Sequence, residues 1–535
     1  MIRFYLFAAF ALALGYAQFR ESGLPEIAGR LEVSVEQAGS GRLVPARVYL
    51  FKNDRPFRLS PVEALFPIRV DMFYRERLWQ TRRRAATLEV TCNDQSHFLL
   101  LDGKGNYDLP AGKYRVEAYR GLFFKPASEE FELRAGQTTS VVLKLAPVKG
   151  HEQWLSGDDH IHITRGPEDD DVFLRWLQAE DLSVGNFLQL QRQMDAAVQY
   201  AFGPAGEAKA PGYSLRPGHE SRSAFYGHVN LLGGREMIRP LSVGSEYANS
   251  PEAYPFPTIL FRRGRALGAT VGYAHFDGSV KHSALLLDLA HRSLDFVEVQ
   301  QFGVTKSEAW YQVLNAGFQV TGIAGSDFPV GLGRLKAWPR AIPLLGPERT
   351  LVKAAPGDSA YEAWAAGVRR GAVVVSNGPL VEFTVNGKGP GTIIPWSGES
   401  LQATGSVGVA AYRPIESVEV VLNGQVVASR KGDGKQTELD MPFQLPLRES
   451  AWIAARVNCV REESEPAIQA HTNPVYLLRE GKPVLVRADR EALLRKWEAE
   501  AAYYKSPELK FGSEQQRSEL LRAVDETLRV LRAGL

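Results

Sequence analysis

The spacing of apolar side chains changes twice along this 535-residue chain, and this constrains the fold more than any other feature. Up to about residue 147, and again from about residue 380, apolar and polar residues alternate in short runs, which is typical of half-buried strands. Between these regions, short apolar runs alternate with amphipathic stretches, which favours strands connected by helices and a parallel sheet. We therefore expect a multidomain chain with a central α/β domain between two all-β domains. The central parallel sheet can be closed or open, and the length of the domain suits a small β/α barrel.

The domain boundaries follow from these changes. We predict a β-sandwich at residues 24–147, a central domain at 151–379 and a second β-sandwich at 380–478. Residues 105–114 place turn residues between two alternating runs of the first sandwich. In the second sandwich, Asn423-Gly424 between two apolar runs predicts a tight hairpin.

Residues 486–535 have the pattern of two amphipathic helices. Asp489 is the expected N-cap of the first helix, and Ser513 with Gln516 forms the expected capping box of the second. Leu493 and Trp497 belong to an apolar face of the first helix. We expect this pair to pack on its own chain rather than on a partner protein, and no partner protein is identified.

The first residues have the features of a secretory signal peptide. Residues 1–17 combine a positive charge at Arg3, an unbroken apolar run and small residues at the two positions that a signal peptidase reads. The mature protein should then begin near Gln18 and be secreted or periplasmic. The run is too short to span a bilayer as a helix, and we expect no membrane span in the mature chain. The alternatives are a buried strand and an uncleaved anchor.

Charge and cysteine content exclude several function classes. The formal net charge is +2, so nothing favours binding to nucleic acid or to an anionic membrane, and the one tight basic run, at residues 82–84, is interpreted as a loop. Cys92 and Cys459 are the only cysteines, and both one disulfide and two free thiols are compatible with them. Two cysteines cannot form a zinc knuckle, so a metal would need histidines and carboxylates.

Such residues gather in the central domain. His160 and His162 stand two apart, and residues two apart on a strand point to the same side, as two ligands of one metal must. Asp158 would lie on that same face and orient the ligands from behind. A lone pair of this kind is also compatible with two half-exposed strand histidines.

Four further candidates each end an apolar run or begin the loop after it, where β/α barrels place catalytic groups. They are Glu220, His228, His275 and Asp327. Taken singly, Glu220 can be a surface acid, His228 a core histidine and Asp327 a helix cap. Together with His160 and His162, the four make six possible ligands in one domain, which indicates a metal centre.

These residues resemble the motifs of the polymerase-and-histidinol-phosphatase (PHP) family of metallohydrolases. Five segments are similar to its carbaryl-hydrolase-like (CehA/McbA) branch, namely residues 179–182, 227–233, 271–275, 376–379 and 470–476. The resemblance covers roughly residues 151–477. The first sandwich is similar to transthyretin-like or carboxypeptidase-regulatory-like domains, which accompany enzymes without being catalytic.

The resemblance implies a TIM-like (β/α)7 barrel with metal ions at the carboxyl ends of its strands. By position, one ion would be held by His160, His162, Glu220 and Asp327, and a second by Glu220, His228 and His275, with Glu220 bridging the two. His219 and Glu220 are neighbours, so on a strand they point to opposite faces and only one can face the metal. Glu220 is the expected ligand, because the resemblance places a Glu there and bridging needs a carboxylate.

The departures from the family pattern concern a third metal site. Thr164, residues 188–190 and Pro329 stand where fuller family members have its histidines. Their joint absence predicts about two divalent ions, and mixed imidazole and carboxylate ligands suit zinc, manganese or iron.

The predicted function is hydrolysis of a phosphoester, carbamate, amide or ester of a small-molecule substrate by metal-activated hydroxide. Arg165 and Arg222 lie close to ligands in the sequence and are candidates to hold an anionic group, although both can be ordinary surface residues. The alternative function is a non-catalytic exported module that binds metal or glycans. A glycosidase with paired carboxylates is a weaker alternative, because the two neighbouring histidines have no role in that mechanism.

Overall fold

The computed structural model describes residues 28–57, 59, 64–68, 88–92, 96–191, 196–244, 250–276, 282–329, 340–354, 360–463 and 465–533. The predicted signal peptide and the basic run at residues 82–84 lie outside them, as does the side chain of Cys92. Cys459 is a free, buried thiol. No helix among the described residues is long and apolar enough to cross a membrane.

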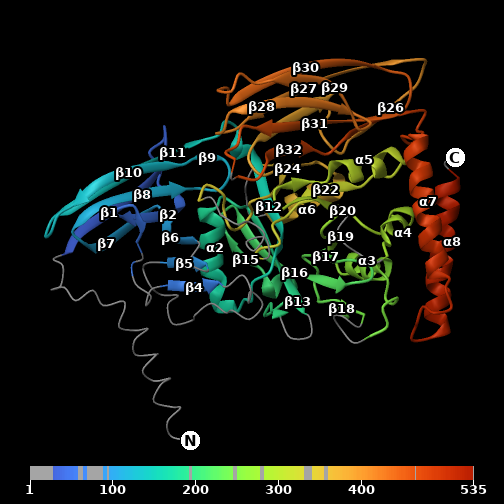
Figure 1. Cartoon of the computed structure of the whole chain (residues 1–535), viewed down its shortest axis with the longest axis horizontal. Helices are drawn as coiled ribbons and strands as arrows, with labels where there is room; N and C mark the ends of the chain where they lie inside the picture. Colours follow the sequence, from blue (N-terminus) through green and yellow to red (C-terminus); the bar gives the residue numbers. More distant parts are fainter. Residues whose placement is uncertain are drawn as a thin grey trace, which may run out of the picture.

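The N-terminal domain consists of two sheets that share one core (Figure 1). One sheet has the order β7-β1-β11-β9, and the other has the order β10-β8-β2-β6-β5-β4 with β3 beside β2. Their bounds are β1 (Ala28–Gln37), β2 (Pro45–Lys52), β3 (Arg55–Pro56), β4 (Ala64–Ile68), β5 (Leu88–Cys92), β6 (Ser96–Asp102), β7 (Lys104–Pro110), β8 (Gly112–Tyr119), β9 (Phe124–Lys125), β10 (Ala127–Leu133) and β11 (Thr138–Pro147).

One expectation for this domain was wrong. Most of the predicted turn at residues 105–114 belongs to the two strands β7 and β8, and only Ala111 separates them. Tyr107 and Leu109 alternate with exposed neighbours and enter the core, so this segment pairs with β1 along its length.

The central domain contains a ring of strands. β12 (Trp154–Ile161) runs parallel to β13 (Val184–Gln191), and β13 runs parallel to β16 (Tyr213–Ser223). Beyond β17 (Val229–Leu232), the ring continues through β19 (Thr270–Tyr273), β20 (Phe296–Gln301) and β22 (Thr321–Ala324), which are parallel to one another. A parallel bridge between Ile161 and Phe328 connects the end of the ring to its first strand.

The ring differs from an all-parallel β/α repeat at β17, which is antiparallel to both β16 and β19. Only five residues separate β16 from β17, and a parallel crossover needs a dozen or more, so the chain must turn back. Short strands accompany the ring at β14 (Ala196–Ala197), β15 (Ala208–Ala210), β18 (Ser242–Val243) and β21 (Val304–Thr305).

Helices surround the ring. The described ones are α2 (Asp170–Ala179), α3 (Pro257–Ala266), α4 (Leu285–Ala290), α5 (Ser307–Asn315) and α6 (Ala360–Arg370), with 3-10 turns at His151–Gln153, Pro167–Asp169 and Gly203–Gly206. The buried residues of α2 belong to one core cluster with Ile161 and Phe187 of the ring. Apolar packing of this kind fixes the strand ends that carry the candidate ligands.

The C-terminal β-rich region is joined to the central domain by continuous strand pairing. β23 (Arg349–Lys353) pairs with β12, β24 (Val373–Ser376) pairs with β23, and β32 (Ile468–Thr472) pairs with β24. The remaining strands are β25 (Leu380–Val385), β26 (Ile393–Trp396), β27 (Leu401–Ala410), β28 (Ile415–Leu422), β29 (Gln425–Lys431), β30 (Glu438–Leu447), β31 (Ala451–Cys459) and β33 (Val475–Arg479). The predicted hairpin at Asn423-Gly424 is confirmed by the pairing of β28 with β29.

Residues 470–476 form hydrogen bonds between the C-terminal region and the central domain. The side-chain amide of Asn473 accepts a hydrogen bond from the Gly322 backbone N–H at 2.8 Å and donates one to the Gly322 carbonyl at 2.7 Å. His471 hydrogen-bonds the hydroxyl of Tyr311 on α5. These contacts hold β22 of the ring against the C-terminal region.

Two helices, α7 (Arg487–Tyr504) and α8 (Glu514–Arg532), end the described chain and lie against one side of the central domain (Figure 1). The predicted packing on their own chain is confirmed, because Leu493 and Trp497 share a core cluster with Tyr226 of the central domain. Ser513 caps α8 as predicted. Asp489 does not cap α7, which begins two residues earlier, and accepts a hydrogen bond from Asn315 instead.

Candidate metal centre

The strand ends of the ring bring all six predicted ligands together. His160 lies on β12 and Glu220 on β16, whereas the others stand just before or just after a strand. Their nitrogen and oxygen atoms form two groups whose members lie within 4.8 Å of one another, namely His160, His162 and Asp327, and Glu220, His228 and His275. We call these groups the inner triad and the outer triad.

The inner triad is enclosed by protein. The Nε2 atoms of His160 and His162 are 3.0 Å apart, and each lies near Asp327 Oδ1, at 3.5 and 3.4 Å. The side chains of His160 and His162 are 0% and 1% exposed. Burial of this kind keeps water away from the three donor atoms and strengthens their interaction with a cation.

The outer triad is more open. Glu220 Oε1 lies 2.8 Å from His228 Nδ1 and 3.6 Å from His275 Nε2. The His228 and His275 side chains are 15% and 25% exposed. Glu220 also reaches the inner triad, since its Oε2 is 3.3 Å from His162 Nε2, so its carboxylate lies between the two groups.

The tautomers of the inner histidines indicate that a cation belongs between them. His160 Nδ1 lies 3.0 Å from Glu298 Oε1, and His162 Nδ1 lies 3.2 Å from the Leu188 carbonyl, so both Nδ1 atoms donate. If both rings are neutral, both Nε2 atoms then carry lone pairs, and these face each other at 3.0 Å. Two lone pairs this close repel unless a proton or a metal ion lies near both. Imidazole nitrogens and carboxylate oxygens are suitable ligands for zinc, manganese and iron, so the residues fit such ions.

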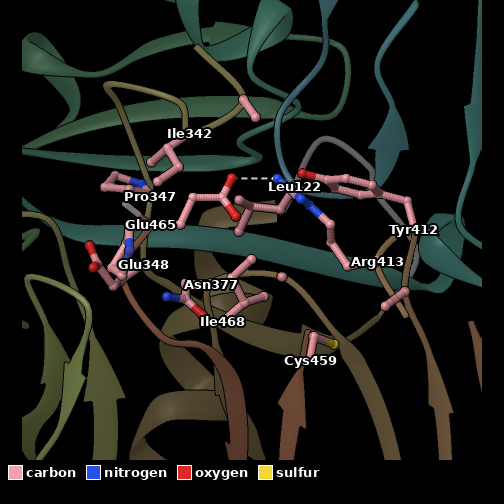
Figure 2. A pocket seen from close by; sticks show the side chains of 14 residues that line it. Leu122, Ile342, Pro347, Glu348, Asn377, Tyr412, Arg413, Cys459, Glu465 and Ile468 are labelled. Atoms are coloured by element: carbon pink, nitrogen blue, oxygen red, sulfur yellow. Dashed lines mark hydrogen bonds and ion pairs between the residues drawn. The ribbon is translucent and has the colours of Figure 1, made fainter. Parts of the chain in front are cut away.

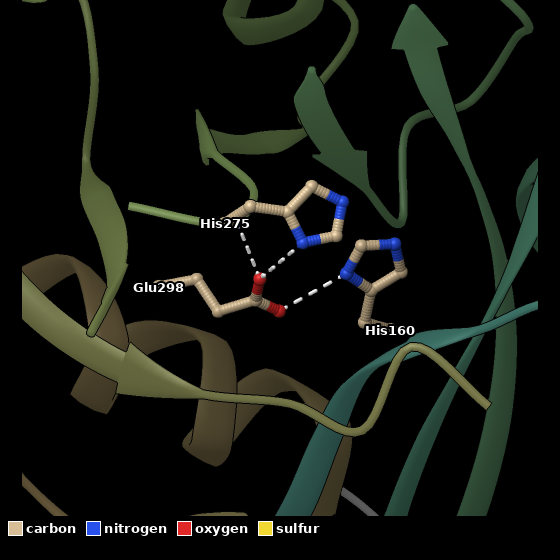
Figure 3. Close-up of side chains that lie close together, drawn as sticks. All are labelled: His160, His275 and Glu298. Atoms are coloured by element: carbon tan, nitrogen blue, oxygen red, sulfur yellow. Dashed lines mark hydrogen bonds and ion pairs between the residues drawn. The ribbon is translucent and has the colours of Figure 1, made fainter. Parts of the chain in front are cut away.

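Glu298 is a functional candidate that the sequence analysis missed. Figure 3 shows its carboxylate between His160 and His275, with one oxygen toward each. Oε1 accepts from His160 Nδ1, and Oε2 accepts from the His275 backbone N–H at 2.7 Å. A carboxylate behind a ligating histidine fixes its ring and raises its basicity. The available signal was the charged side chain inside the apolar strand 296–299, because such residues are almost never buried without a partner.

Glycine at position 325 makes room for this arrangement. A Cβ atom there would lie 2.1 Å from Asp159 Oδ1, 2.8 Å from Glu298 Oε1 and 3.0 Å from His160 Cβ. Any side chain would therefore push Glu298 away from His160. The close approach of the loop after β22 to β12 depends on this residue.

The pKa values of the side chains in the centre are shifted by burial and by their charged neighbours. Burial alone would lower the pKa of His162, but hydrogen bonds to Asp327 and Glu220 raise it to about 9. Burial would likewise lower the pKa of His275, but Glu220 and Asp327 raise it to about 10. Burial opposes ionisation of Glu220, yet His228 and His162 hold its pKa well below the ordinary value. In Glu298, burial dominates and raises the pKa to about 8.

Asp158 does not contact a histidine ring. Its carboxylate accepts hydrogen bonds from the backbone N–H groups of His160 and Ser326, both at 3.0 Å, and from that of Gly346. The Ser326 hydroxyl donates a further bond to it. Asp158 thus fixes the backbone positions of His160 and the loop that carries Asp327, which is a positioning role like the predicted one but acts through the backbone.

The two candidate arginines differ. Arg222 lies at the centre, with Nε 3.3 Å from His228 Nε2 and 4.0 Å from Glu220 Oε2. Arg165 is buried away from solvent, and its nitrogens bond Gln199, Asp170 and the Gly206 carbonyl. These partners explain Arg165 as a structural residue.

His219 lies apart from the triads. Its buried ring packs near Phe202, and its Nε2 atom has no hydrogen-bond partner among the described residues. Burial lowers its pKa to about 3, so the ring is neutral. The alternation of side chains along β16 therefore directs Glu220, not His219, toward the inner and outer triads.

The positions of the absent third site hold ordinary structural residues. Leu188 belongs to an apolar cluster, and the Thr164 hydroxyl accepts a hydrogen bond from the Val198 N–H at 3.2 Å. A further group of possible ligands, His160, His275 and Glu298, takes one histidine from each triad.

One cavity opens on the centre. It has a volume of about 460 Å³ and is lined by His228 and His275 together with residues of α4, α5 and α7. A different cavity, shown in Figure 2, lies where both sandwiches meet the central domain, next to the ion pair between Arg413 and Glu465. It measures only about 30 Å³, which is space for about one water molecule and not for a substrate.

Comparison with known proteins adds little. No family model matches the chain, and no curated protein matches it. A two-domain protein from Bacteroides vulgatus that contains a predicted PHP-like metal-dependent phosphoesterase is similar at 12% identity and a TM-score of 0.31, over 61% of this chain and 95% of that one. The TIE protein of Bacillus anthracis has 8% identity and a TM-score of 0.14, over 84% of this chain and 49% of that one. Both TM-scores are too low to support a conclusion about fold or function.

Proposed function

We propose that this protein is a PHP-type metal-dependent hydrolase whose inner and outer triads hold about two divalent ions. The observation that carries the proposal is the convergence of four imidazoles and two carboxylates, with Glu220 between the two triads. When bound, two such ions polarise a substrate oxygen and lower the pKa of water toward neutrality, which supports hydrolysis of a phosphoester, carbamate, amide or ester.

The side chains of the centre have distinct parts in this reaction. Glu220 places negative charge between two cations, which would otherwise repel strongly in a site with little water. Glu298 holds the ring of His160 through its Nδ1 atom and the backbone of His275 through its N–H, while Gln301 Oε1 hydrogen-bonds the His275 ring at 2.7 Å. Arg222, beside His228 at the more open end, is placed to bind an anionic group of the substrate.

Metal content and turnover test the proposal together. Elemental analysis of protein purified without chelator should give about two divalent ions per chain, and the loaded protein should hydrolyse at least one class in a phosphoester, carbamate, amide and ester panel. Glu220→Gln keeps the side-chain size but removes the bridging charge, so it should abolish turnover and lower metal content more than His228→Ala does.

His219→Leu is the matched control, because it changes the adjacent buried residue on the other face of β16 and should keep metal and activity. Circular dichroism confirms folding of each variant. A protein that binds no metal under any loading condition, or an active Glu220→Gln variant, would contradict the proposal. Metal binding without turnover on any substrate would favour the non-catalytic module.

The proposal includes export to the periplasm or the medium, which is supported by the signal-like residues 1–17. N-terminal sequencing of protein from the native cell should give a start near Gln18. An intact Met1 on a cytoplasmic species would refute this part alone.

A further inference from the structure

The cavity beside the outer triad is completed by a helix from the far end of the chain. Its walls come from the loops around His228 and His275, from α4 and α5, and from α7, which contributes Leu493, Lys496 and Trp497. Its volume of about 460 Å³ is in the range of small-molecule sites. The candidate metal centre alone therefore does not form the whole pocket, because one wall is supplied by α7.

Most of the cavity wall is apolar. Tyr226, Phe276, Leu286, Val313 and Leu493 line it and are largely buried behind its surface. Such a wall favours an aliphatic or aromatic body, since transfer of apolar area from water contributes roughly 25 cal/mol per Å². The polar side chains on the wall include Ser283, Gln312, Lys496 and Glu500, besides the two histidines of the outer triad.

The rim carries one cation. Lys496 is the only Lys or Arg among the described residues that line the cavity, and it is exposed and forms no ion pair with any described residue. Glu500, which lies four residues further along α7 and also lines the cavity, is bound to another partner, because its Oε2 lies 3.0 Å from His282 Nδ1. The ammonium group of Lys496 is therefore available to an anionic group of a ligand.

The wall is held rigidly in place. The ring of His282 stacks on Tyr503 of α7 with centroids 3.5 Å apart and an angle of 8° between the planes. Trp497 is completely buried, and Tyr504 packs against Phe225 and Tyr226. Aromatic packing on this scale fixes α7 as part of the site and not as a mobile cover.

We propose that α7 is the substrate-selecting wall of the enzyme, and that the cavity takes substrates with an apolar body that ends in an anionic group recognised by Lys496. This inference rests on the proposed hydrolase function for the orientation of the substrate, with its reacting bond at the outer triad and its anionic end at Lys496. The binding of the apolar and anionic parts does not depend on turnover.

The charge is tested with two esters of equal chain length, p-nitrophenyl hexanoate, which is neutral, and mono-p-nitrophenyl adipate, which ends in a carboxylate. Lys496→Met keeps the length of the side chain and should raise KM for the adipate by about five-fold, as expected for one exposed ion pair, without changing kcat or the hexanoate KM. Lys496→Arg should restore the adipate KM. Arg495→Met, which removes a charge from the same helix outside the cavity, is the control and should change neither substrate.

The apolar body is tested by filling the cavity. Ala309 of α5 lines it, and Ala309→Trp should lower kcat/KM for both long esters at least ten-fold more than for p-nitrophenyl acetate. If the ratio of kcat/KM for the long esters to that for p-nitrophenyl acetate is unchanged in this variant, the apolar part of the substrate does not bind in this cavity and the proposal is overturned.

A binding measurement separates this inference from the hydrolase function. Calorimetry should show that phenylhexanoate binds the protein more tightly than phenylhexanol, and that Lys496→Met removes the difference while Arg495→Met keeps it. If no class in the phosphoester, carbamate, amide and ester panel is cleaved but this difference is found, the hydrolase proposal fails and the pocket stands. If Lys496→Met affects both ligands equally, or neither, the inference is overturned.

Discussion

The inner and outer triads use similar ligand types in different surroundings. In the inner triad, protein groups surround both imidazoles, and their Nδ1 atoms are bonded to Glu298 and to the Leu188 carbonyl. In the outer triad, His228 and His275 are partly exposed and line the cavity to which α7 contributes one wall. The comparison suggests that an inner ion is held and an outer ion meets the substrate.

The largest expected effect comes from removing one ligand of each triad. His160→Ala takes away an inner ligand and leaves the buried Glu298 without its partner, so turnover should fall by on the order of 10³-fold or more. His228→Ala should retain more turnover, and added metal should restore part of it. The measurement is kcat/KM over a metal titration, with circular dichroism to confirm folding. Greater loss from His228→Ala than from His160→Ala would break the comparison.

The next largest effect is expected from Glu298, which contacts one histidine of each triad. Glu298→Gln should weaken metal binding at both positions by about 10–100-fold, because Glu298 orients one histidine of each triad. Glu348→Gln is a matched control. Burial also raises the pKa of Glu348 to about 8, but that residue contacts the Gly303 backbone and no ligand. A loss confined to one ion would show that Glu298 serves one triad only.

The rate of metal removal by a chelator should differ between the inner and outer triads. A chelator added in excess should release the metal in two phases, with the outer ion leaving first because its histidines are partly open to solvent. A colorimetric metal indicator follows both phases, and His228→Ala should remove the faster one. A single phase in the unmodified protein would mean that the two positions do not differ in access.

The smallest effect is the response to pH. In metal-free protein, the pKa values of His162 and His275 are raised to about 9 and about 10, so each triad holds a protonated imidazole at neutral pH. Metal binding at pH 7 should therefore release about one proton from each triad, and calorimetry in buffers of different ionisation enthalpy measures this number. Release of no proton would show that the imidazoles are already neutral.

The same pKa values set the stability of chelated protein. Both are raised above the ordinary histidine value of about 6.5, so their contacts with Glu220 and Asp327 stabilise the fold fully below that pH and are lost as the pH rises toward 9 and 10. Thermal unfolding midpoints of chelated protein should fall across this window. Metal-loaded protein should not share the decline.

Local signals in the sequence predicted much of the fold. Alternating apolar residues gave the strands of both sandwiches, and Asn423-Gly424 gave the hairpin between β28 and β29. Each proposed ligand carried its own signal, because a histidine or carboxylate at the end of an apolar run is visible without knowledge of the fold. The alternation along β16 also separated Glu220 from His219.

What failed depends on contacts between distant segments. Glu298 acts on His160, which is 138 positions away, and no local pattern marks that pair. Arg165 is close to the ligands in sequence, yet partners from other loops bury it. Asp489 has a suitable cap residue type, but Asn315 of α5 binds it instead. The contribution of α7 to the cavity likewise follows only from tertiary packing.

The position of α7 near the end of the chain determines the order in which the site is assembled. Synthesis proceeds from the N-terminus, so every residue of the inner and outer triads leaves the ribosome well before Leu493 and Trp497 do. Until α7 docks, the outer triad faces solvent across the whole mouth of the unfinished cavity. On the proposed function, a newly made chain would therefore have its metal ligands in place before its substrate cavity is complete, and a truncated chain that lacks α7 would retain the ligands without the proposed selecting wall.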